Sequence, residues 1–131
     1  LNTATLPDGY HELAAVAYEG THIRTQTRRT LPIRIQNTTL TATLTFLSLG
    51  ATNSVSGSYS IQVAANTNNV SRITLYSTGG ALETATNQSP ATFVINGTDL
   101  GVGTHPIYAL VQDQTGRRYR TETRRVQFIS P

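Results

Sequence analysis

The sequence predicts an all-β protein built as an antiparallel sandwich, and three observations support this fold class. Residues 39–46 alternate strictly between Thr and apolar side chains, which is the period of a strand with one buried face. Shorter segments with the same period cover 59–65, 70–76 and 92–95, and turn residues such as Gly-Gly and Asn-Gly separate them. No segment sustains apolar residues at helical spacing.

One pattern occurs twice, and it sets the expected domain organisation. Leu6-Pro-Asp-Gly-Tyr-His11 and Leu100-Gly-Val-Gly-Thr-His105 share the form Leu-x-x-Gly-x-His, and each precedes a strand, a turn and a second strand. The glycines are 94 residues apart (103 − 9). The arginines that open two Arg-Thr-x-Thr-Arg-Arg motifs are 96 apart (120 − 24), which predicts a second turn two residues longer.

A period of about 95 residues is close to the size of one β-sandwich domain, roughly 100 residues. The expected domains are therefore a complete sandwich over residues 37–131 and a β-hairpin over residues 1–36. The hairpin corresponds to the last two strands of a preceding unit.

The repeated pattern resembles the end of bacterial immunoglobulin-like or fibronectin type III-like domains. In those families a Leu-x-x-Gly-x-Tyr/His phrase opens strand F, and strand G closes the domain. The resemblance covers residues 37–131 as one whole unit and residues 1–36 as the end of another. It implies an immunoglobulin-like sandwich that serves as a spacer, a stalk, an adhesive module or an accessory module, and the motif itself carries no chemistry.

The corner residue differs from the one that such sandwiches often have. Their Tyr hydroxyl bonds to a backbone carbonyl a few residues upstream, whereas this chain has His11 and His105 at the corresponding positions. A neutral imidazole can donate one ring N–H in a similar way. We predict that His105 is a buried structural residue bonded near Asp99 or Leu100.

Residues 1–36 pose a physical problem, because an isolated two-stranded hairpin is marginal in water. One solution is a tandem array in which a preceding domain supplies the missing strands. The other is that the hairpin packs on the complete unit, or on a second copy through its unpaired edge. For a stable fragment we favour the second, as a strand-exchanged or edge-paired homodimer, although the sequence leaves both open.

Composition narrows the class of protein. Charged residues are 13% of the chain, about half the usual share, so Thr, Ser, Asn and Gln must supply the polar surface, as is typical of extracellular β proteins. All ten basic residues are Arg and the net charge is +3. Since they alternate with Thr, Gln and Glu, we expect cross-strand ion pairs and no nucleic-acid partner.

No membrane span is expected, since no apolar run approaches about 20 residues. The first residues lack the features of a signal peptide, and the signal of an exported parent is expected upstream of this fragment. The chain has no Cys, which excludes disulfides, thiol chemistry and Cys-ligated metals.

No motif indicates catalysis. The chain lacks a Gly-x-Ser-x-Gly turn, a phosphate-binding loop, an EF-hand and an argued carboxylate pair. We therefore expect no enzyme activity, no cofactor and no metal, with calcium near Asp8 or Asp99 as a minor alternative.

One sheet face is a candidate ligand surface. Tyr76 and Tyr108 fall on strands that neighbour each other in this topology, with Arg72, Tyr119 and Arg120 nearby. A Tyr/Arg surface suits a polysaccharide or an acidic glycan. The simpler interpretation is that these side chains cover an exposed sheet or meet a neighbouring domain.

The leading hypothesis is a non-catalytic structural or interaction module, a spacer or an adhesive domain, of a larger extracellular or cell-surface protein. Its expected partners are neighbouring domains of the same polypeptide. The alternative is a carbohydrate-binding accessory module of a secreted polysaccharide-active enzyme.

Overall fold

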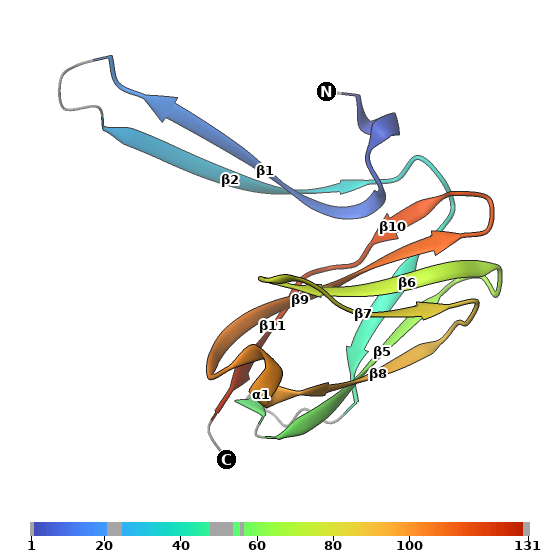
Figure 1. Cartoon of the computed structure of the whole chain (residues 1–131). Helices are drawn as coiled ribbons and strands as arrows, with labels where there is room; N and C mark the ends of the chain where they lie inside the picture. Colours follow the sequence, from blue (N-terminus) through green and yellow to red (C-terminus); the bar gives the residue numbers. More distant parts are fainter. Residues whose placement is uncertain (1, 21–24, 48–53, 56, 130–131) are drawn as a thin grey trace.

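The computed structural model describes residues 2–20, 25–47, 54–55 and 57–129, and its two β-sheets face each other across one apolar core (Figure 1). The first sheet has the order β3-β5-β8. Its strands are β3 (Ala42–Phe46), β5 (Ser58–Ala65) and β8 (Ala91–Asn96).

The second sheet has β9 (Gly103–Asp113) at its centre. One edge of β9 pairs with β6 (Val70–Ser77), which in turn pairs with β7 (Gly80–Thr86). The other edge pairs first with β11 and then with β10 along its length. These strands are β10 (Arg118–Arg120) and β11 (Arg124–Phe128), and β4 (Ser54–Val55) pairs with β11.

The core consists of the inward side chains of both sheets. Alternate residues of β5 and β8 are buried. Ile61 and Phe93 are at most 1% exposed, as are Ile73, Ile107 and Val126 of the second sheet. This burial follows from the period of two in the sequence. The predicted all-β, immunoglobulin-like sandwich is confirmed.

Three local features differ from the sequence prediction. The segment Gly97–Leu100, expected as a turn, forms the short helix α1, and Thr3–Thr5 forms a 3-10 turn capped by the Asn2 side chain. Two short pairings are parallel, β11 with β4 and β1 with β10. The sheets are therefore antiparallel except at these two places.

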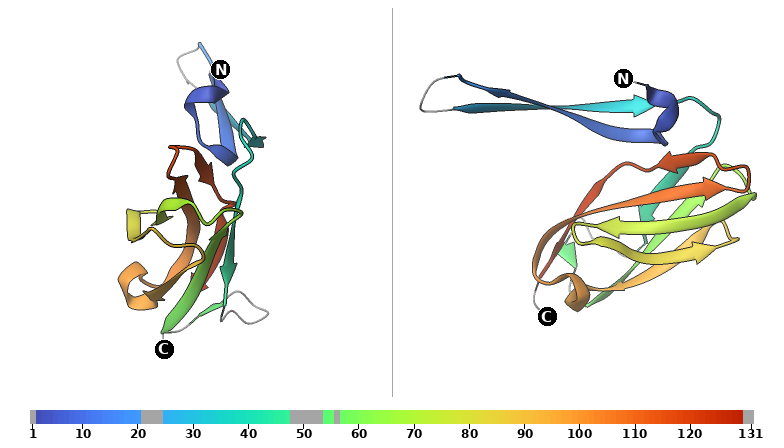
Figure 2. Two further views of the ribbon diagram at one scale, coloured as in Figure 1. Left: turned by 90° about the vertical axis from the view of Figure 1, so that its right-hand side faces the viewer. Right: turned by 45° about the horizontal axis from the view of Figure 1, so that its top comes forward.

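The N-terminal segment forms the expected hairpin, with β1 (Asp8–Tyr18) and β2 (Gln26–Ile35) paired in one register. It projects from one end of the sandwich (Figures 1 and 2). Among the described hairpin residues, only Asp8 and Gly9 pair with a strand of the sandwich, β10, and Leu13 and Leu31 are 43% and 59% exposed. The hairpin therefore contacts the complete unit at its base, while a preceding domain and a homodimer stay predictions.

The predicted turn lengths are also wrong. Residues 19–25 separate β1 from β2, and residues 114–117 separate β9 from β10. The first copy therefore has the longer connection. Arg24, on which the 96-residue offset depends, lies outside the described residues.

Candidate functional site

Three of the predicted ligand-face residues form one stack on the outer face of the second sheet. The rings of Tyr76 and Tyr108 have centroids 5.2 Å apart and an interplanar angle of 10°. The Arg120 Cζ atom lies 3.9 Å from the centroid of the Tyr108 ring. Because β9 runs between β6 and β10, Tyr76 and Arg120 approach Tyr108 from opposite sides. Both faces of this ring are covered.

The other two predicted residues do not join this stack. Tyr119 is 3% exposed and belongs to the core, because it precedes Arg120 on one strand and successive side chains point to opposite faces. Arg72 lies on the outer face, but its Nη2 atom donates to Gln112 Oε1 over 3.2 Å. The predicted five-residue surface is therefore reduced to a stack of three and a separate Arg–Gln pair.

Arg120 also holds the hairpin. Its Nη1 atom donates to the Tyr10 carbonyl of β1 over 2.9 Å, and its Nη2 atom donates to Thr123 Oγ1 over 3.2 Å. A planar guanidinium offers several donors in a fixed geometry. The guanidinium group of Arg120 thus contacts the face of the Tyr108 ring, the hairpin backbone and the segment between β10 and β11.

The backbone makes a second connection at the same place. Asp8 pairs with Tyr119 and Gly9 with Arg120 in parallel. Gly9 has φ +100°, and a Cβ atom there would lie 2.0 Å from the Arg120 carbonyl oxygen. Only glycine permits this approach in this conformation.

A buried carboxylate makes the third connection. Asp8 is 3% exposed, and its oxygens accept from the backbone N–H groups of Asn37 and Thr38, both at 2.8 Å, and from the Thr38 hydroxyl. Burial by itself raises the pKa of Asp8. The bonds from Thr38 and Asn37 and the charge of Arg117 outweigh it, so that the pKa lies below its ordinary value. The start of β1 is thereby fixed to the segment that enters the sandwich.

We call these contacts of Asp8, Gly9 and Tyr10 with Asn37, Thr38 and Arg120 the hairpin junction. Sequence reasoning considered Asp8 only as a minor calcium alternative. It missed that the Asp8 carboxylate accepts from backbone N–H groups about 30 residues further along the chain, at Asn37 and Thr38, because no local pattern encodes such a contact.

A second buried carboxylate closes the turn between β9 and β10. Asp113 is 1% exposed and forms an ion pair with Arg117, Nε to Oδ2, at 2.6 Å. Burial again opposes ionisation, but the bonds from Thr115 and Arg117 outweigh it and hold the pKa of Asp113 below its ordinary value. Both carboxylates are thus ionised in the folded protein at neutral pH.

These lowered pKa values predict that stability falls in acid. A carboxylate with a lower pKa in the folded state than in the unfolded state stabilises the fold above the unfolded pKa, about 3.9 for Asp. That contribution is lost as the pH falls through the folded pKa. We expect the Tm by circular dichroism to be level from about pH 7 to pH 5 and to fall below about pH 4.

Substitutions test the origin of this acid sensitivity. Asp113→Asn should lower the Tm at pH 7 and flatten the acid side of the profile, while Asp99→Asn, at an exposed position, should keep the wild-type slope. An Asp113→Asn profile parallel to that of the wild type would show that this carboxylate does not carry the effect.

The two histidines make the same contact 94 residues apart. His105 Nε2 bonds to the Gly101 carbonyl at 3.0 Å, and His11 Nε2 bonds to the Pro7 carbonyl at 2.7 Å. His105 differs from the prediction in two respects. It is only half-buried, and its partner is Gly101 rather than Asp99 or Leu100. Its ring also lies 5.4 Å from that of Phe128.

His105→Phe is expected to lower the free energy of unfolding of the sandwich by about 1 kcal/mol, since one net hydrogen bond is lost. Chemical denaturation followed by circular dichroism measures this. His11→Phe is the matched control: its contact lies in the hairpin, so the sandwich transition should shift by less than about 0.5 kcal/mol. Equal effects of the two variants would contradict the structural role of His105.

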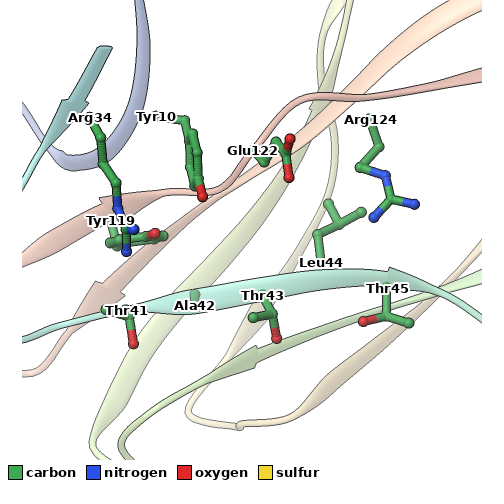
Figure 3. Close-up of a pocket in the computed structure, with 10 residues that line it drawn as sticks. All are labelled: Tyr10, Arg34, Thr41, Ala42, Thr43, Leu44, Thr45, Tyr119, Glu122 and Arg124. Carbon is green, nitrogen blue, oxygen red and sulfur yellow. The ribbon is translucent and has the colours of Figure 1, made fainter. Parts of the chain in front are cut away.

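A groove of about 470 Å³ opens between the hairpin junction and the edge strand β3 (Figure 3). On the hairpin side of the groove, the Arg34 Cζ atom lies 5.4 Å from the centroid of the Tyr10 ring. The lining of the groove includes hydroxyls, two guanidinium groups and one carboxylate. Its residues are Tyr10, Arg34, Thr41, Ala42, Thr43, Leu44, Thr45, Tyr119, Glu122 and Arg124. The sequence did not predict this groove, because its residues come from three distant segments.

The groove and the stack offer aromatic rings, guanidinium groups and hydroxyls, which are groups that bind ligands. Within the described ranges, no three His, Asp or Glu side chains gather as metal ligands. The same part of the chain contains no helix with the length and apolar character needed to cross a membrane.

Comparison with known proteins gives similarity in structure only. No protein-family model and no curated protein sequence matches the chain. One similar structure is the sulfur carrier protein SoxY from Chlorobium limicola f thiosulfatophilum, with 12% identity, a TM-score of 0.47, and coverage of 66% of this chain and 78% of that chain. Another is the fibronectin(III)-like modules of Clostridium thermocellum CbhA, with 15% identity and a TM-score of 0.47. That alignment covers 94% of this chain and 63% of the other.

Proposed function

We propose that this chain is a non-catalytic structural module of a larger extracellular or cell-surface protein, in which it acts as a stiff spacer between neighbouring domains. The observation that carries the proposal is the hairpin junction. A flexible connection would need a linker without fixed contacts, whereas here the hairpin and the sandwich share backbone pairing, a buried carboxylate and a bridging guanidinium.

The stack of Tyr76, Tyr108 and Arg120 supports the same function. Stacked rings and a guanidinium on an aromatic face add attraction beyond area burial. Since Arg120 also bonds to Tyr10, the stack connects the exposed face of the second sheet to the junction. Its side chains serve to orient the hairpin.

A distance measurement across the junction tests the spacer. The chain has no Cys, so a chain with the two substitutions Ala14→Cys on the hairpin and Thr92→Cys on β8 carries one spin label at each of these exposed positions. Electron–electron double resonance should give one narrow distance distribution. Arg120→Ala should broaden it, and Arg72→Ala, which removes an Arg that bonds only within the second sheet, should not. A broad distribution in the unsubstituted chain would identify a hinge and overturn the proposal.

Carbohydrate binding is the alternative function, and the half-buried Tyr76 ring on the outer face of the second sheet is the feature that favours it. Against it, Tyr108 has no free face for a sugar ring, since Tyr76 and Arg120 cover it. A glycan array separates the two functions. Saturable binding that Tyr76→Ala abolishes would support the accessory module, and the spacer predicts no binding.

A further inference from the structure

The hairpin exposes apolar side chains to an unusual degree. Half of the large apolar residues that are exposed in the described part of the chain lie on β1 and β2, namely Leu13, Val16, Tyr18 and Leu31. A two-stranded ribbon cannot bury both of its faces alone. An exposed apolar patch of this kind marks an interaction site.

The two hairpins of the chain share one pairing frame. Gly9 pairs with Ile35 and His11 with Ile33, while Gly103 pairs with Phe128 and His105 with Val126. The first strands are thus offset by 94 residues (103 − 9) and the second strands by 93 (128 − 35). Both glycines have positive φ, +100° and +131°, and both histidines bond to the carbonyl four residues upstream.

This frame assigns counterparts of known environment to many of the hairpin residues. Five odd-numbered residues of β1 and β2 correspond to residues of β9 and β11 that face the core, whereas Leu31 corresponds to the exposed Arg124, and Thr27 and Arg29 have no counterpart in β11. The pairs are Leu13 with Ile107, Ala15 with Ala109, Ala17 with Val111, Ile33 with Val126, and Ile35 with Phe128. All five counterparts are at most 2% exposed, and the hairpin residue is apolar in every pair.

The environments differ in one respect, which is the sheet opposite. In the complete unit the counterparts pack with inward side chains of β3, β5 and β8, such as Leu44, Ile61 and Phe93. In the first hairpin Ile35 is already buried at the junction, whereas Leu13, Ala15 and Ala17 are exposed. The side chains for one half of a core are present without the other half.

We propose that this odd-numbered face of β1–β2 is one half of a second sandwich, and that its partner is a three-stranded antiparallel sheet equivalent to β3–β5–β8, carried by a preceding unit of the same protein. A second copy of the chain is a poorer fit, because its free surface is another two-stranded ribbon. The inference rests on the proposed function, since it supplies the neighbour that the spacer would hold.

A matched pair of thiols tests this face. Ala15→Cys lies on the odd-numbered face and Ala14→Cys on the opposite face, and both positions are exposed in a chain without other cysteines. In the 131-residue chain both should react with a thiol reagent at similar rates. The missing sheet is then supplied by repeating residues 37–99 directly before Leu6, because Leu6 and Leu100 are equivalent. We expect Ala15→Cys to react about tenfold or more slowly in this extended chain, with Ala14→Cys nearly unchanged.

Two results would overturn the proposal. One is equal reactivity of the two thiols in the extended chain. A triple variant of the extended chain tests whether imperfect packing causes this equal reactivity. It carries Leu13→Ile, Ala17→Val and Ile33→Val, which give the hairpin the side chains that β9 and β11 present to β3–β5–β8. If this variant does not protect Ala15→Cys, whether or not it folds, the result counts against the proposal. The other is protection in the 131-residue chain that rises with protein concentration, which would make a second copy the partner. The spin-label distance across the junction is independent of these results, so a failed partner and a failed spacer are distinguishable.

Discussion

Phe93→Ala is expected to lower the free energy of unfolding of the sandwich by about 3–5 kcal/mol, the usual loss for a large aromatic residue truncated in a core. Phe93 is 1% exposed on β8, where it pairs with Ile61 of β5. Its ring belongs to the cluster that joins the two sheets. Guanidinium denaturation followed by circular dichroism measures the change, because the midpoint should fall with little change in slope.

Val94→Ala is the matched control, on the same strand but on its other face. Val94 is 64% exposed, so its truncation should change the free energy of unfolding by less than about 0.5 kcal/mol. Similar losses for the two variants would mean that the inner face of β8 does not pack against the second sheet. The contrast between neighbours in sequence therefore tests the two-layer architecture.

The same alternation explains why so much of the sandwich could be predicted. A strand with one buried face repeats every two residues, and β3, β5, β6 and β8 all carry that signal in their own residues. Which side of each strand faces the core follows from the strand alone. No knowledge of its partner is needed.

Features that depend on distant segments could not be obtained in this way. The Arg-Thr-x-Thr-Arg-Arg similarity suggested an offset of 96, but the pairing relates β2 to β11 by 93. Polar, exposed residues constrain strand register weakly, and the apolar pairs Ile33/Ile35 and Val126/Phe128 set it. The register also shifts by one residue between β10 and β11, since Arg120 pairs with Leu110 and Arg124 with Ile107.

The candidate site shows the same division. Tyr76 and Tyr108 were brought together correctly because β6 and β9 are neighbours in the predicted topology. Tyr119 was misplaced, although its position next to Arg120 already required the two side chains to point to opposite faces. The hairpin junction was missed because it joins segments about 30 and about 110 residues apart, as in the contacts of Asp8 with Thr38 and of Tyr10 with Arg120.

Gly9→Ala is expected to detach the hairpin from the sandwich. The new Cβ atom would lie 2.0 Å from the Arg120 carbonyl oxygen and 2.9 Å from its carbonyl carbon, and backbone atoms cannot yield as the tip of a side chain can. The pairing of β1 with β10 must open. The distance distribution between labels at Ala14→Cys and Thr92→Cys should broaden, while the Tm of the sandwich changes little because its core is untouched.

Gly103→Ala is the matched control, because Gly103 occupies the equivalent position in the second copy of the Leu-x-x-Gly-x-His pattern, and we expect the opposite result. Its φ of +131° also disfavours a side chain, but no described atom lies within 4 Å of the added Cβ. The variant should bear only the backbone strain, roughly 1–2 kcal/mol, at the start of β9. It should therefore lower the Tm of the sandwich and leave the distance distribution narrow.

A narrow distribution in Gly9→Ala would contradict the prediction. It would mean that the close approach of Gly9 to Arg120 does not fix the hairpin, and that Asp8 and the Arg120 side chain alone orient it.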